Sequence, residues 1–301
     1  MTDRSYGDDK CTFEKEPQNG INGIASAPKG VDAAKARETD MTNAPQIPEP
    51  KPAATVLLVR DQPEFQVLMV KRHHQIDFAS GALVFPGGKT HAGDTDERWA
   101  EHAIGWDELD PVQRTLRIGA IREAFEETGI LLAQTPQGAP FEDPCAASVR
   151  SAVDSGEVAF IDVIRELGVH LRLDVLAIFA RWITPTMMLK RFDTWFYVMS
   201  APPGQVAACD GRETVDAEWI SPSEAIRLAA VGERTIIFPT LMNLKLLAEA
   251  ASAQDCIARA RQRRLVTVLP EVSIENGERV LVIPPDAGYG PVSQSLRTLG
   301  V

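Results

Sequence analysis

The stretch "VFPGGKTHAGDTDERWAEHAIGWDELDPVQRTLRIGAIREAFEETGILLA", Val84 to Ala133, opens with a glycine turn and ends in closely spaced carboxylates. On a helix, residues three and four apart are neighbours, so Glu123, Glu126 and Glu127 gather on one face. Each like-charge pair at that spacing costs about 0.2–0.5 kcal/mol, which Arg122 offsets in part. Such a face is either an ordinary solvated surface or a cation site.

The turn before this helix favours the cation site. Phe85-Pro86-Gly87-Gly88 predicts a strand that ends in permissive backbone, where phosphate oxygens can approach main-chain N–H groups. Three carboxylates on a rigid helix suit Mg2+, which takes oxygen ligands and keeps waters that a phosphate can displace. A P-loop is excluded, because Leu83 stands where that motif requires glycine.

The same residues resemble the signature of the Nudix family, G-x5-E-x7-R-E-U-x-E-E-x-G-U, in which U is a bulky apolar residue. "REAFEETGI", Arg122 to Ile130, matches the second half, except that small Ala124 takes the first U position. Gly88 begins the first half, and Asp94 stands where the family has glutamate. Residues 95 to 121 form a spacer of 27 residues, 20 more than the usual seven.

A long insertion at this place resembles the branch of the family that includes peroxisomal coenzyme A diphosphatases. "WITPTMMLKRFDTWFYV" and "EWISPSEA" also look like that branch, and the resemblance covers about residues 53 to 290. It implies an α/β/α sandwich around a mixed β-sheet, and the irregular alternation of strand-like and helix-like stretches points to the same class. The role of the insertion stays open between a lid and a dimer contact.

The resemblance also implies residue roles. Glu123, Glu126 and Glu127 would bind Mg2+ or Mn2+, and Arg122 would orient them. Asp94 would replace a glutamate that helps to hold metal-bound water, although it is one methylene shorter. The catalytic residues are then expected to be Glu127, Glu213, Asp94 and Arg122.

The general base and the substrate contacts are less defined. Glu213 lies six residues before Trp219, as a base in a loop before a Trp-bearing strand would, and Glu218 competes with it. Arg72, Phe85, Gly87 and Gly88 are the expected substrate-binding residues. They belong to a coenzyme A motif of the family, of which "LMVKRHHQIDFASGALVFPGG" keeps Arg72, Gly81 and FPGG. His73 and Asp77 replace two of its other residues.

These features together predict a metal-dependent pyrophosphohydrolase that cleaves a nucleoside diphosphate linked to another moiety. Coenzyme A or acyl-coenzyme A is the first expected substrate, giving 3′,5′-ADP and a phosphopantetheine. NADH, ADP-ribose or a dinucleoside polyphosphate is the alternative within the same class. A non-catalytic nucleotide sensor is the alternative from another class, but such modules usually lose carboxylates that "REAFEETG" retains.

Composition sets further limits. A net charge of -11 argues against a nucleic-acid surface, which needs clustered Lys and Arg. The four cysteines show no ligand spacing and predict reduced thiols. No apolar run approaches the ~18 residues of a membrane span. We expect a cytoplasmic protein with a small-molecule substrate and no membrane partner, and a homodimer is common in the family.

Local signals divide the chain into elements. Residues 1–52 predict a disordered tail and a stiff, proline-rich linker. Residues 53–301 predict the Nudix domain, with the insertion at about 95–110 and a C-terminal helix and hairpin. Asp110-Pro111 and Gly129 predict the ends of the carboxylate helix. One long helix is expected over about 238–263, and a hairpin that turns at Asn276-Gly277.

Overall fold

The computed structural model describes residues 47–73, 81–142, 147–209, 212 and 214–296. Residues 1–46 of the predicted tail and linker, which span residues 1–52, lie outside the described residues. The strands are β1 (Lys51–Arg60), β2 (Gln66–Arg72), β3 (Leu83–Val84), β4 (Gly87–Lys89), β5 (Ala103–Ile104), β6 (Ala133–Gln134), β7 (His170–Arg172), β8 (Ala177–Ile183), β9 (Phe192–Ser200), β10 (Thr214–Ile220), β11 (Thr267–Val268), β12 (Glu271–Glu275), β13 (Glu278–Val282) and β14 (Ser293–Ser295). The helices are η1 (Ala92–Thr95), η2 (Glu97–Glu101), α1 (Pro111–Thr128), α2 (Ala147–Asp154), α3 (Phe160–Leu167), α4 (Pro222–Ala230), α5 (Phe238–Leu247) and α6 (Ala253–Gln262).

The main sheet is mixed, as predicted. Its strand order is β10-β2-β1-β9-β8-β11, with β3 paired to β2 and β4 paired to β1. β1 runs parallel to β9 over its whole length and antiparallel to both β2 and β4. β1 is therefore central, and its residues from Ala53 to Val59 are buried, as a strand covered on both faces requires.

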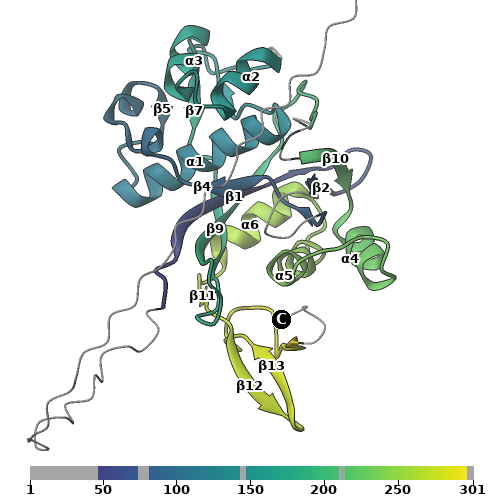
Figure 1. Cartoon of the computed structure of the whole chain (residues 1–301). Coiled ribbons are helices and arrows are strands. Elements are labelled where there is room, and N and C mark those ends of the chain that lie inside the picture. The colour runs from purple at the N-terminus through teal and green to yellow at the C-terminus, as the bar shows by residue number, and fades with distance from the viewer. Residues whose placement is uncertain (1–46, 74–80, 143–146, 210–211, 213, 297–301) are drawn as a thin grey trace, which may run out of the picture. The chain divides into compact units, whose positions relative to one another are not determined.

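Two hydrophobic clusters cover the two faces of this sheet. Alternate side chains of β1 divide between them, Ala54, Val56 and Leu58 toward one and Leu57 and Val59 toward the other. The first cluster contains residues of α1 and α3, and the second contains residues of α5 and α6. Figure 1 shows α1, α2 and α3 on one side of the strands and α5 and α6 on the other. The predicted α/β/α sandwich is thus confirmed.

The carboxylate helix α1 has the ends that its sequence predicts. Asp110 caps its start, accepting a hydrogen bond from the Gln113 N–H at 2.9 Å, and Pro111 is its first residue. Gly129 ends it with φ 74°, a left-handed conformation that an L side chain rarely adopts. These local signals place the carboxylates in the last two turns of a rigid element.

The insertion before α1 forms regular structure. It contains the short helix η2 and then strand β5, which pairs with β7. Trp99 of η2 is fully buried and packs against Phe160 of α3. The insertion is therefore part of the first core.

Three boundaries differ from the sequence predictions, and one turn agrees. β1 begins at Lys51, two residues before the predicted domain start. The single helix expected over 238–263 is wrong, because α5 ends at Leu247 and α6 begins at Ala253, where Ser252 caps a new helix by accepting from the Asp255 N–H. The short strands β3 and β4 replace one longer strand in "ALVFPGG". The hairpin β12–β13 turns at Asn276 and Gly277, both with positive φ, as predicted.

Over the described part of the chain, none of the helices has the length and apolarity needed to cross a bilayer.

Candidate active site

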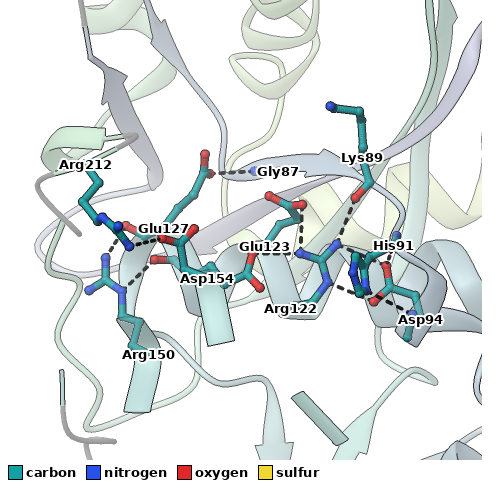
Figure 2. Close-up of polar contacts among 12 residues, drawn as sticks. Gly87, Lys89, His91, Asp94, Arg122, Glu123, Glu127, Arg150, Asp154 and Arg212 are labelled. Atoms are coloured by element: carbon teal, nitrogen blue, oxygen red, sulfur yellow. Dashed lines mark hydrogen bonds and ion pairs between the residues drawn. The ribbon is translucent and has the colours of Figure 1, made fainter. Parts of the chain in front are cut away.

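Arg122 lies at the centre of a polar cluster beside the carboxylate helix (Figure 2). Its Nε and Nη2 donate to the two carboxylate oxygens of Asp94, at 2.9 and 3.1 Å. Its Nη1 donates to Glu123 at 3.0 Å and to Glu126 at 2.8 Å, and Nη2 also reaches the carbonyl oxygen of Lys89 at 2.9 Å. One guanidinium thus holds two of the predicted metal ligands and the strand β4.

Asp94 lies behind Arg122, in the protein interior. It is 1% exposed, and its Oδ2 also accepts from the His91 N–H at 2.7 Å. The turn that carries it is held by Trp99, whose indole Nε1 donates to the Gly93 carbonyl oxygen at 2.9 Å. Its described contacts make Asp94 an anchor of Arg122, and its role in holding metal-bound water stays a prediction.

The two glycines of the turn approach the carboxylates closely. The Gly87 N–H donates to Glu127 Oε2 at 2.9 Å. At Gly88, a Cβ atom would overlap the carboxylate group of Glu123, so a larger residue there would displace that carboxylate. The turn and the helix are therefore closely fitted to each other.

Electrostatics reflect this concentration of charge. Burial acts to lower the pKa of Arg122, but the hydrogen bonds to Asp94 and the nearby Glu123 charge outweigh burial and raise the pKa above its usual range. Burial raises the pKa of Glu126, and Arg122 opposes that shift only in part. A further positive charge at this face would therefore favour the ionised glutamate.

A large cavity connects this face to the rest of the sheet. It has a volume of about 1490 Å³ and is lined by Glu123, Glu126 and Glu127 at one part. Thr55 of β1 pairs with Gly87 of β4 on one side and with Phe196 of β9 on the other. Trp182 of β8 lies opposite Thr194 of β9, and all of these residues line the cavity. With strands ~4.8 Å apart, its floor extends about 14 Å from the glycine turn to Trp182.

The donor set suits a hard divalent cation. Carboxylate oxygens are the ligands that Mg2+ prefers, and each carboxylate has about four lone-pair sites, so one hydrogen bond does not exhaust it. Among the residues with described positions, no three acidic, histidine or cysteine side chains already form a cation cage. Glu123, Glu126 and Glu127 nevertheless line one cavity, and they are the residues that would hold the cation.

The other predicted residues divide into two groups. Arg72, at the end of β2, lines the cavity together with Phe85, Gly87 and Gly88. Among the described residues, none accepts a hydrogen bond from the buried Nε of Arg72, which makes Arg72 a suitable anion contact. Glu218 is not among the described residues that line the cavity, and it accepts from Arg234 Nε at 3.3 Å. Glu213, the preferred base, lies outside the described residues, as do Asp77 and residues 74–80.

Sequence analysis missed two side chains of α2. Arg150 is buried and contacts the end of α1, and Asp154 lines the cavity and forms an ion pair with Arg212 at 2.9 Å (Figure 2). Neither residue belongs to a motif or a recognisable spacing. Only the packing of α2 against α1 shows their position.

Comparisons with known proteins agree with this geometry. The family model described as NUDT19 Nudix domain matches residues 105–247. The acyl-coenzyme A diphosphatase NUDT19 of Homo sapiens is 27% identical over 282 residues, covering 78% of this chain and 75% of that protein. The protein of the same name from Xenopus laevis is 25% identical over 207 residues, and the chain spans about half of its length, 54%.

A solved structure shows the same fold. A Nudix hydrolase from Alicyclobacillus acidocaldarius superposes with a TM-score of 0.62 at 25% identity, covering 71% of this chain and 97% of that one. The signature residues around Gly88 and Arg122, the sandwich fold and these matches have one common explanation. The chain is therefore similar to the Nudix hydrolases and, among them, to the acyl-coenzyme A diphosphatases.

Proposed function

We propose that the chain is a divalent-metal-dependent Nudix pyrophosphohydrolase that cleaves a nucleoside diphosphate linked to another moiety. One observation carries the proposal: Glu123, Glu126 and Glu127, oriented by Arg122 and the glycine turn, line one large cavity. A solvated surface helix would not bury Glu126 and Glu127 to 8% and 4% exposure.

The side chains present can perform the tasks that this reaction needs. When bound, Mg2+ or Mn2+ supplies charge neutralisation at phosphate oxygens and lowers the pKa of water. Glu123, Glu126 and Glu127 would hold the ion, and Arg122 would keep them in place through charge-assisted hydrogen bonds. Arg72 would bind a phosphate oxygen of the substrate. Glu213 or a carboxylate of α1 would take the proton from the attacking water.

Coenzyme A or an acyl-coenzyme A is the substrate that these features favour. The relatives are named acyl-coenzyme A diphosphatases. Arg72 and Gly81 retain part of the family's coenzyme A motif. The cavity also continues from the carboxylates over apolar Phe196 and Trp182, which suits an elongated substrate with an anionic and a less polar end. The products would be 3′,5′-ADP and a phosphopantetheine, acylated where the substrate is.

The test is hydrolysis of a substrate panel by the full chain. The panel contains coenzyme A, acetyl-coenzyme A, a long-chain acyl-coenzyme A, NADH, ADP-ribose and diadenosine tetraphosphate, each with Mg2+, Mn2+ or EDTA. Products are identified by mass. Glu127→Gln removes a predicted metal ligand at nearly constant shape, and Glu224→Gln is the matched control, because Glu224 pairs with Arg227 on the surface of α4.

We expect 3′,5′-ADP from coenzyme A substrates and no product in EDTA. Glu127→Gln should lower turnover at least ~100-fold, because loss of one group that stabilises charge in the transition state typically costs about that much. Glu224→Gln should match the wild type. Preference for another member of the panel would refute the coenzyme A assignment but leave the metal-site assignment in place. Tight binding without turnover of any member would favour the nucleotide sensor, and full turnover by Glu127→Gln would refute the metal assignment.

A further inference from the structure

The C-terminal end of α1 presents carbonyl groups that the helix itself cannot satisfy. The last four carbonyls of any α-helix lack partners within the helix. Here the Phe125 carbonyl accepts from the Gly129 N–H at 2.8 Å, and the Thr128 carbonyl accepts from the Ala208 N–H at 2.9 Å. The two carbonyls between them, of Glu126 and Glu127, belong to predicted metal ligands.

Arg150 of α2 binds both of those carbonyls. Its Nε donates to the Glu126 carbonyl oxygen at 2.7 Å, and its Nη2 donates to the Glu127 carbonyl oxygen at 2.9 Å. Its Nη1 donates to the Ala208 carbonyl oxygen at 2.7 Å. The side chain is buried, with 8% of the residue exposed. Figure 2 shows Arg150 beneath the end of the helix, on the opposite side from the Gly87 contact of Glu127.

This contact suits a guanidinium in particular. The fork of N–H groups is planar and rigid, so it can bind two successive carbonyls at once, which an ammonium group does less well. A cation at a helix C-terminus is also favoured by the helix dipole. Gly129 lies next to this contact, since a Cβ at that residue would lie 3.4 Å from Arg150 Nη1, and its positive φ of 74° is what favours glycine there.

A second pair of contacts joins the same region. Thr214, the first residue of β10, donates its hydroxyl to the Glu127 carbonyl oxygen at 3.2 Å. Asp154, one helical turn after Arg150, pairs with Arg212 at 2.9 Å and adds negative charge near Glu126. Helix α2 thus links the end of α1 to the residues that enter β10.

We propose that Arg150 is a positioning residue for the metal site, which holds the backbone of Glu126 and Glu127 and so fixes where their carboxylates lie. The inference rests on the proposed function, because it takes these glutamates as metal ligands. Arg150 is not among the described residues that line the cavity, so we assign it no direct contact with substrate. Its effect should therefore show in the binding of the metal ion itself.

The test is Mn2+ binding to the full chain without substrate, by isothermal titration calorimetry, for Arg150→Lys and Arg150→Met. Partners that orient metal ligands typically change affinity by about 10–100-fold when removed, and we expect Arg150→Met in that range. Arg150→Lys keeps the charge but loses the fork, so its affinity should fall between those of the wild type and Arg150→Met. Hydrogen exchange in peptides covering residues 122–130 should be faster in both variants.

Arg117 provides the matched control. It is also a buried arginine, on α1 itself, and its Nη1 donates to the Leu173 carbonyl oxygen at 2.6 Å. Its contact lies outside the cavity lining, so Arg117→Met should lower thermal stability and leave the Mn2+ dissociation constant unchanged.

Two results would overturn the inference. One is Mn2+ affinity at the wild-type level in Arg150→Lys and, where it folds, in Arg150→Met. The other is an equal loss in Arg117→Met, which would indicate general destabilisation. If Arg150→Met does not fold, Arg150→Lys alone decides between these outcomes. A wild-type chain that binds no Mn2+, or a Glu127→Gln variant that binds it equally well, would instead refute the proposed metal site.

Discussion

The replacement of Asp94 by asparagine tests whether this residue serves the fold or the chemistry. Asp94 is 1% exposed and forms a two-pronged contact with Arg122, at 2.9 and 3.1 Å. Asparagine has nearly the same shape and can still accept one hydrogen bond, but it has no charge. The change therefore removes one ionic partner of a buried arginine at nearly constant volume, and it places the asparagine NH2 group against a donor, Arg122 Nε on one side or Arg122 Nη2 and the His91 N–H on the other.

The expected cost follows from the contacts that remain. Removing one partner of a buried ion pair typically costs about 3–5 kcal/mol. Arg122 keeps Glu123 and Glu126, so its charge is still compensated. We therefore expect a somewhat smaller loss of about 2–3 kcal/mol in unfolding free energy, consistent with the worth of a hydrogen bond to a charged group. At about 2–4 °C per kcal/mol for a domain of this size, Tm should fall by about 4–12 °C.

The assay is thermal and urea unfolding, measured together with hydrolysis at a temperature where every variant is folded. Asp96→Asn is the control, because Asp96 forms a similar ion pair with Arg98, at 2.6 Å, on the surface. Exposed pairs contribute little, so this variant should unfold close to the wild type.

Asp94→Glu separates the two roles of Asp94. It restores the family's usual residue, but the extra methylene enters a filled site. Asp94 Oδ2 packs so closely against Gly119 of α1 that a Cβ at Gly119 would lie 3.0 Å from it. Overpacking of this kind costs about 1–3 kcal/mol, and we expect lower stability without a gain in turnover. Turnover above the wild type in Asp94→Glu, or an unchanged Tm in Asp94→Asn, would refute the anchoring role.

Two further predictions concern neighbouring glycines and a buried thiol. Gly87→Ala should lower the free energy of unfolding by about 1–3 kcal/mol, because a side chain there is strained at φ 154° and meets the backbone of β1. Gly88→Ala should instead displace the movable Glu123 carboxylate, which would weaken Mn2+ binding with little change in Tm. Calorimetry and thermal unfolding of the two variants separate these effects, and equal losses of stability would contradict them. Burial raises the pKa of Cys256 to about 12, so this thiol stays protonated at pH 8 and should resist iodoacetamide in the native chain but react in urea. Peptide mass spectrometry checks this, with the half-buried Cys209 as the internal comparison, and rapid native labelling of Cys256 would contradict its burial.

Local signals in the sequence determined the ends of the site helix and the chemistry on it. Asp110, Pro111 and Gly129 act through capping and backbone conformation, which need no distant partner, so the bounds of α1 followed from them. The spacing of Glu123, Glu126 and Glu127 put them on one face for the same reason. The hairpin at Asn276 and Gly277 was equally local.

The long helix predicted over 238–263 failed because apolar periodicity says little about short breaks. Ser252 is a local signal for the start of a new helix, which the apolar periodicity obscured. Its side chain caps the start of α6. The same limitation applies to the insertion. The indole of Trp99 is buried against Phe160, some sixty residues away, so no neighbouring residue could show that the insertion belongs to the core.

The sequence by itself thus determined the carboxylate helix, its glycine turn and the family that they resemble. Only the tertiary structure decided which partners hold them. Asp94 meets Arg122 across 28 residues, and Arg150 meets the Glu126 carbonyl across 24. The parallel pairing of β1 with β9 joins the glycine turn to Trp182 along one cavity floor. These contacts depend on how separate elements pack against each other, and the spacing of residues along one element does not show which other element will lie beside it.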